Sequence, residues 1–281
     1  MTVNSHIRRN TGRALQANWS KGIAIGLVFL SIHILLLLVE KTIYTFLSSS
    51  GYKNLFSSIT AVQKWISSGQ YDTVAHLVTL LIVGIVSLFL VSPIWFGGIK
   101  WAYAVASGEN SPIALIFYFY TSAKRYFHSI GIILSVFFRM LGYLIVSLLP
   151  ACAIYSLAWF YQSSGYYSAY IYWVMLGFTW LLLFTGLIFF IYVCSKYYLV
   201  GFLFVEDSSL KIAQMIRLSS CIMKGERFQL IMLLICMVPL LVLCVIFIPI
   251  IFVIPYLSVE LALFAKYQIE HAKREVLAES L

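Results

Sequence analysis

Charge is scarce in this sequence. Only 10% of its 281 residues are Asp, Glu, Lys or Arg, whereas a typical soluble domain has about 25%. Apolar residues make up 62% of the chain, more than a soluble core of this length can bury. A soluble fold is therefore excluded, and we expect an all-α polytopic membrane helical bundle that forms one domain over residues 1–281.

The motifs of the common enzyme classes are missing as well. The sequence has no GxSxG, HExxH, GxxxxGK[ST] or GxGxxG stretch, and none of its five histidines has another histidine four residues away. Its five cysteines form no CxxC pair, and most lie in apolar runs, where cysteine packs as a small hydrophobe. We therefore expect no enzyme activity, no metal site, no cofactor and no disulfide framework.

Six apolar segments are present instead. The first begins near Gly22 and runs too long for a signal peptide, so we interpret it as a retained first span. Pro249 and Pro255 interrupt the last apolar stretch, which favours two short helices with a tight outer turn over one long kinked helix. The predicted spans are residues 22–47, 74–105, 130–161, 168–198, 229–247 and 251–269.

The positions of Lys and Arg decide between these alternatives. Fifteen of the 19 lie in the N-terminal segment, the loops 99–129 and 196–228, and the C-terminal tail; three lie on the opposite side, and the last is Arg139. Because cytoplasmic segments collect basic residues, both termini are predicted to be cytoplasmic, which requires six spans. The same bias explains the net charge of +9, so no nucleic-acid partner is expected.

Three basic, amphipathic segments are predicted to be interfacial helices, at residues 6–20, 110–126 and 208–224. In the last of them, Asp207 or Ser208 can cap the helix start and Gly225 suits its end. Such helices are expected to lie along the inner headgroup layer and to contact anionic lipid. Each precedes a pair of spans, which fits either a threefold repeat or three similar loops. The candidate headgroup contacts are Lys124, Arg125, Arg217, Lys224 and Arg227.

Ionisable residues at membrane depth are costly and therefore candidates for function. Arg139 lies nine residues into the third span and Glu260 six residues before the sixth span ends, which corresponds to depths of about 13 Å and about 9 Å. At these depths the two side chains can form an intramembrane ion pair that locks two helices. Alternatively, Arg139 faces a cavity open to the cytoplasm and holds an anion such as a lipid phosphate.

A polar cavity is the second candidate site. His33 lies near the middle of the first span, where an interhelical hydrogen bond is its simplest role. Gly97 and Gly98 allow either close helix packing, the simpler interpretation, or unwinding at a cavity.

Three stretches carry a resemblance to a known family. They are "TGRALQANWSKGI", "FGGIKWAYAVASGE" and the segment from Lys196 to Tyr267, with an acidic turn, "MKG" and a Pro-Tyr pair. They resemble a family of uncharacterised multi-pass membrane proteins of Gram-positive bacteria and, more distantly, the membrane domain of some glycerophosphodiester phosphodiesterases. The resemblance implies six spans and a bacterial plasma membrane, but no activity.

Two functions follow from these observations. The first is a non-enzymatic accessory or scaffold protein that contacts the lipid bilayer, anionic lipid and a membrane-protein partner. The alternative is a permease-like protein that moves a lipid or an amphipathic small molecule through a cavity around Arg139, His33 and Gly97–Gly98. Pairing of Arg139 with Glu260 favours the scaffold, and a cavity at Arg139 favours the permease.

Overall fold

The chain is all-α in the residues that the computed structural model describes, which are 3–49, 71–164, 168–244 and 249–279. This confirms the all-α part of the predicted fold class for those ranges. The elements are α1 (Val3–Leu15), α2 (Trp19–Ser49), α5 (Tyr71–Ala106), the 3-10 helix η2 (Ile113–Tyr120), α6 (Ala123–Ser163), α7 (Ala169–Cys194), η3 (Ser195–Tyr197), α8 (Val200–Glu206), α9 (Ile212–Ile222), α10 (Arg227–Leu243) and α11 (Ile250–Glu279).

Five helical stretches are long and apolar enough to cross a membrane, and a sixth counts if α9 and α10, which meet at 86°, form one bent span. By itself α10 has 17 residues, slightly fewer than the ~20 that a span needs. Two separate helices are observed around Pro249, because α10 ends at Leu243 and α11 begins at Ile250. The second is longer than predicted, since α11 has 30 residues and continues through Pro255. The turn predicted between them falls largely on residues 245–248, outside the described residues.

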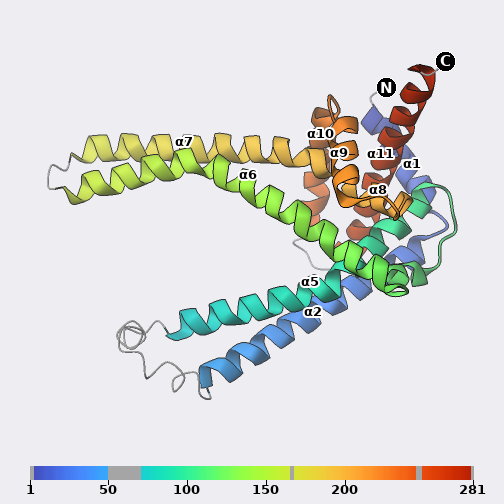
Figure 1. Ribbon diagram of the computed structural model, residues 1–281, viewed down its shortest axis with the longest axis horizontal. Coiled ribbons are helices and arrows are strands. Elements are labelled where there is room, and N and C mark those ends of the chain that lie inside the picture. Colours follow the sequence, from blue (N-terminus) through green and yellow to red (C-terminus); the bar gives the residue numbers. More distant parts are fainter. Residues whose placement is uncertain (1–2, 50–70, 165–167, 245–248, 280–281) are drawn as a thin grey trace.

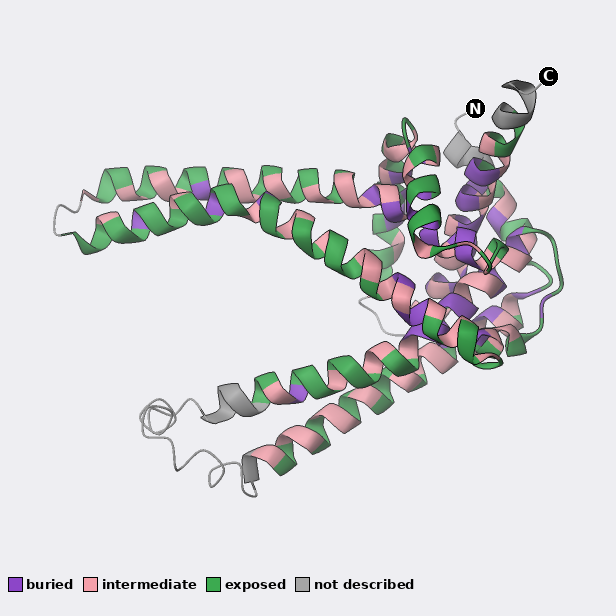
Figure 2. Cartoon of the chain, in the orientation of Figure 1, coloured by how far each residue is buried: buried purple, intermediate pink, exposed green. Residues whose placement is uncertain are grey.

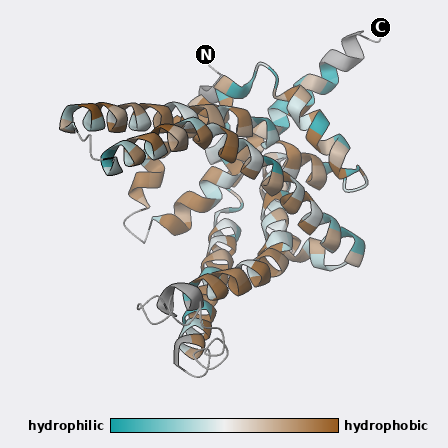
Figure 3. Ribbon diagram, turned by 60° about the vertical axis from the view of Figure 1, so that its left-hand side comes forward, coloured by the Kyte–Doolittle hydropathy of each residue, from teal (hydrophilic) through white to brown (hydrophobic). Residues whose placement is uncertain are grey.

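The helices are arranged as two arms on a common base (Figure 1). The first arm consists of α2 and α5, and the second arm of α6 and α7; each pair lies side by side. In the second arm the two helices approach closely at Gly186, where a Cβ atom would lie 2.5 Å from the carbonyl oxygen of Ser147. Large apolar side chains are exposed along both arms, which indicates membrane association (Figures 2 and 3).

The base holds most of the buried residues (Figure 2). Trp101 of α5, Phe119 of η2, Phe204 of α8 and Phe264 of α11 are each less than 2% exposed. The Phe119 and Phe204 rings stack with their centroids 4.9 Å apart, so segments distant in the sequence share one core. Both chain termini lie at the base end of the molecule (Figure 1).

Helices occur at the three predicted interfacial segments, with different limits. The first segment is divided between α1 and the start of α2, and the second is η2 followed by the first turn of α6. In the third, α9 begins after Lys211, whose backbone N–H donates to the Gln214 side chain. The predicted caps Asp207 and Ser208 lie in the preceding turn, where Asp207 instead accepts hydrogen bonds from the side chain and backbone of Ser209. Gly225 has φ +99°, as expected at a helix stop.

Candidate functional site

Glu260 pairs with an arginine, but with a different one from the predicted Arg139. The Arg8 Nε donates to Glu260 Oε1 at 3.2 Å. The predicted Arg139–Glu260 pair is therefore wrong, and the reason is which helices are neighbours. Helix α1 packs on α11 and brings Arg8 to Glu260, whereas α6 packs mainly on α7.

The Arg8–Glu260 contact connects helices within the base of the molecule. The Glu260 side chain is fully buried, while that of Arg8 is 40% exposed. A second guanidinium nitrogen of Arg8 donates to the Cys236 carbonyl oxygen of α10, so one side chain links α1, α10 and α11. A buried carboxylate is costly unless it is paired, so the Arg8 guanidinium stabilises the ionised form of Glu260.

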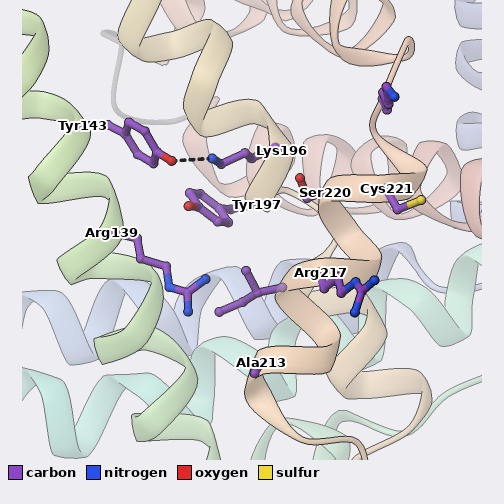
Figure 4. Close-up of a pocket in the computed structure, with 10 residues that line it drawn as sticks. Arg139, Tyr143, Lys196, Tyr197, Ala213, Arg217, Ser220 and Cys221 are labelled. Atoms are coloured by element: carbon purple, nitrogen blue, oxygen red, sulfur yellow. Dashed lines mark hydrogen bonds between the residues drawn. The ribbon is translucent and has the colours of Figure 1, made fainter.

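Arg139 lies elsewhere, in an open pocket at the base of the second arm (Figure 4). The pocket has a volume of about 460 Å³ and is formed by α6, η3 and α9. Within the described part of the chain, no salt bridge joins Arg139 to a carboxylate. Its guanidinium points from α6 toward α9, the helix that carries Arg217 (Figure 4).

Among the described residues, four cations and no carboxylate line this pocket, which we call the cationic pocket. The cations are Arg139, Lys196, Arg217 and Lys224. Four like charges in one pocket repel each other, and an anion bound between them would relieve that repulsion. The chemistry of the lining therefore favours a ligand that carries negative charge.

Lys196 is held in place by two tyrosines. Its Nζ donates to the Tyr143 hydroxyl at 2.8 Å, shown as the dashed line in Figure 4. The same Nζ lies 4.2 Å from the centroid of the Tyr143 ring and 4.9 Å from that of Tyr197. These cation–π contacts fix the ammonium group at the wall of the pocket and leave donor capacity for a ligand.

An apolar groove continues from the cationic pocket along α6. This second pocket has a volume of about 510 Å³ and shares Arg139, Tyr143 and Tyr197 with the first. Its remaining lining is Phe138, Gly142 and Val146, all exposed on the surface of the second arm. A charged pocket that opens into an apolar groove has the two surfaces that an anionic lipid presents.

The other predicted headgroup contacts lie outside the cationic pocket. Lys124 is exposed in the first turn of α6. Arg125 lies with its Cζ 4.5 Å from the ring centroid of Tyr118, and Arg227 lies 5.2 Å from that of Tyr192. Of the five predicted contacts, the pocket therefore includes Arg217 and Lys224.

The predicted polar cavity of His33, Gly97 and Gly98 is not assembled around Arg139. His33 is exposed on α2, and neither pocket at Arg139 includes any of the three residues. A Cβ on Gly97 would lie 1.9 Å from the Ile116 carbonyl oxygen of η2. A Cβ on Gly98 would lie 3.0 Å from the Phe29 ring of α2. Both glycines therefore serve close packing. A pocket does reach Arg139, which is the feature expected of the permease alternative, whereas the Arg139–Glu260 pair expected of the scaffold is not observed.

The prediction missed Lys196, the two tyrosines and Ser220 as lining residues. The sequence does contain a signal for Lys196, since no charged residue occurs between Arg139 and Lys196. These two residues are the first charges on either side of the second arm. In an antiparallel helix pair, residues at similar sequence distances from the connection between the helices lie side by side. The structure places Arg139 and Lys196 in one pocket.

The fold and site define a class of protein, namely an all-α chain with several helices suited to crossing a membrane. The chain belongs to a family described as a protein of unknown function (DUF975), whose profile matches residues 1–272. Comparisons with curated proteins and with solved structures returned no match.

Proposed function

We propose that this chain is a non-enzymatic, polytopic protein of the bacterial plasma membrane that binds anionic lipid of the inner leaflet. It acts as an accessory or scaffold component beside a membrane-protein partner, with both termini in the cytoplasm. The observation that carries the proposal is the cationic pocket, which joins four cations to an apolar groove on α6.

The length of the second arm supports a position of this pocket at the inner headgroup layer. Helix α6 has 41 residues, about 61 Å, which is twice the ~30 Å hydrocarbon core. Tyr170, Tyr172 and Trp173 lie at the start of α7, near the tip of the arm, and suit the outer interface. Counted inward from the end of α6 at Ser163, Arg139 lies about 36 Å away. On this count we propose that Arg139 lies at the inner boundary of the hydrocarbon core, rather than at the depth of about 13 Å expected from the sequence.

The charge pattern supports the same position. The second arm is free of charge between Arg139 and Lys196, and both of these cations line the pocket. Lys and Arg at the ends of spans place their charges in the headgroup region. Anionic lipid phosphates occupy that layer, and basic residues near it are attracted to them by about 1 kcal/mol each.

The lining also supports binding rather than catalysis. It offers cations, hydroxyl groups and the Cys221 thiol, but no carboxylate or histidine among the described lining residues. Proton transfer in enzymes relies most often on those two groups. Cations and hydroxyl donors without such a base are suited to holding a phosphate.

The Cys221 thiol provides a direct test, because it is exposed and lines the cationic pocket. The full-length protein in nanodiscs is treated with a small maleimide, and alkylation of each cysteine is followed by mass spectrometry. Phosphatidylglycerol nanodiscs should slow alkylation of Cys221 relative to phosphatidylcholine nanodiscs. A cysteine introduced by Arg274→Cys, at an exposed position of α11 outside both pockets, is the control. Equal Cys221 rates in the two lipids would refute the proposal.

A further inference from the structure

The cationic pocket contains more positive charge than one lipid phosphodiester can balance. Four cations line it, and no carboxylate of the described lining offsets them. A phosphodiester headgroup such as phosphatidylglycerol brings a single negative charge. A phosphate monoester carries about −1.5 to −2 charges near pH 7.

We infer that the cationic pocket selects a lipid phosphomonoester over lipid phosphodiesters, an inference that rests on the proposed function. The ligand class is a terminal phosphate on an apolar chain. The phosphate is held by Arg139 and Lys196, with Arg217 and Lys224 adding positive charge to the pocket, and the chain follows the groove of Phe138, Gly142 and Val146.

The donors around the pocket match the acceptors of such a phosphate. A monoester presents three terminal oxygens, each a strong hydrogen-bond acceptor. Arg139 points from α6 toward α9, whereas the Arg217 side chain is directed away from Arg139 (Figure 4). A guanidinium group binds phosphate through two parallel hydrogen bonds. Lys196 donates one of its three N–H groups to Tyr143, which leaves donor capacity for a ligand. A diester has two such oxygens and a single negative charge, so it offers these donors fewer acceptors and less charge.

The apolar groove explains why the phosphate belongs to a lipid. Arg139, Tyr143 and Tyr197 border both the cationic pocket and the groove, so a phosphate held by Arg139 has an apolar surface beside it. A Cβ built on Gly142 would meet nothing within 4 Å, so the groove is open at that position. A soluble phosphate would leave this surface unused.

Two variants separate the contributions of the phosphate and the chain. Arg139→Gln removes a cation from the pocket and leaves the groove intact. Gly142→Leu fills the groove, keeps all four cations and adds a residue with better helix propensity at an open position, so the fold is preserved. Arg274→Gln is the matched control, because Arg274 is 76% exposed on α11, outside both pockets.

The experiment is a titration of the purified full-length protein with lipids of equal chain length, followed by native mass spectrometry. The probes are phosphatidic acid, phosphatidylglycerol and phosphatidylcholine, with glycerol 3-phosphate as the monoester without a chain. We expect phosphatidic acid to bind about tenfold more tightly than phosphatidylglycerol, a ratio equal to 1.4 kcal/mol. Glycerol 3-phosphate should bind more weakly than phosphatidic acid by at least the same factor.

The three variants test the inference independently of the comparison between wild-type lipid affinities. Arg139→Gln should reduce the ratio between phosphatidic acid and phosphatidylglycerol toward one. Gly142→Leu should weaken both lipids and leave their ratio unchanged, and Arg274→Gln should resemble the wild type.

The outcomes distinguish this inference from the proposed function. If both anionic lipids bind equally and both are weakened by Arg139→Gln, phosphomonoester selection is refuted and anionic-lipid binding stands. If phosphatidylcholine binds as well as the anionic lipids, or Arg139→Gln changes nothing, both are refuted. If glycerol 3-phosphate binds as tightly as phosphatidic acid, the chain assignment is refuted.

Discussion

Apolar side chains are mostly exposed on the second arm but are buried to a larger extent in the base of the molecule. Of the most apolar window within Ala169–Glu206, 6% is buried inside the protein, compared with 39% of the window within Ile250–Arg274. The arm thus exposes its apolar residues for lipid to cover, while the base covers its own with protein. Because lipid tails are about as apolar as Leu, packing in the base should matter more for stability than packing along the arm.

The largest difference is expected between two phenylalanines. Phe264 is fully buried in the base, and Phe184 is 64% exposed on α7. Phe264→Ala should lower the free energy of unfolding by about 3–5 kcal/mol, because it leaves a cavity in a packed core. Phe184→Ala should change it by less than about 0.5 kcal/mol. Denaturant unfolding in mild detergent measures both, and equal losses would remove the distinction between arm and base.

Variants of the Arg8–Glu260 pair test whether this contact stabilises the base. Arg8→Ala leaves the buried Glu260 carboxylate without its cation, so we expect a loss of about 3 kcal/mol, the low end for breaking a buried pair. Arg139→Ala should cost much less in the same unfolding assay, because Arg139 faces an open pocket. Adding Glu260→Gln to Arg8→Ala should restore part of the loss. A double variant no more stable than the worse single variant would contradict this pairing.

Glycine packing gives a smaller contrast. Gly97→Ala forces a methyl group into the backbone of η2 and should cost about 1–3 kcal/mol, as overpacking usually does. Gly142→Ala on the second arm places the same methyl group in open space and should be neutral or slightly stabilising. Melting temperatures in detergent compare the two. If Gly97→Ala left the melting temperature unchanged, η2 would not pack directly against α5 at Gly97.

The smallest effect is expected at the surface. Lys273 pairs with Glu206, but its side chain is 62% exposed. Lys273→Ala should change the free energy of unfolding by less than about 1 kcal/mol, because solvent screens such pairs. The residual effect should disappear in 0.5 M salt. A large loss that salt does not remove would mean that this end of α11 belongs to the base.

The sequence predicted the positions of the long helices well, because length and apolar composition are local properties. The sequence did not predict the Arg8–Glu260 pair, because this pair depends on the packing of α1 against α11, which are far apart in the chain. The start of the third span was predicted near residue 130, whereas α6 begins at Ala123 and has 41 residues, which is longer than one span. Arg139 was predicted as part of an ion pair or an anion site, and Arg217 and Lys224 as separate headgroup contacts, but not that the three line one pocket. Lys196 was missed although it is the next charge after Arg139.

The central claim is that the cationic pocket holds a lipid phosphate at the inner headgroup layer. Cryo-electron microscopy of the full-length protein in nanodiscs containing phosphatidic acid measures this most directly, with a bound antibody fragment to add mass. The account predicts phosphate density within hydrogen-bond distance of Arg139, with chain density along Gly142, level with the inner headgroups. An empty pocket in that lipid, or a pocket lying outside the headgroup layer, would contradict it.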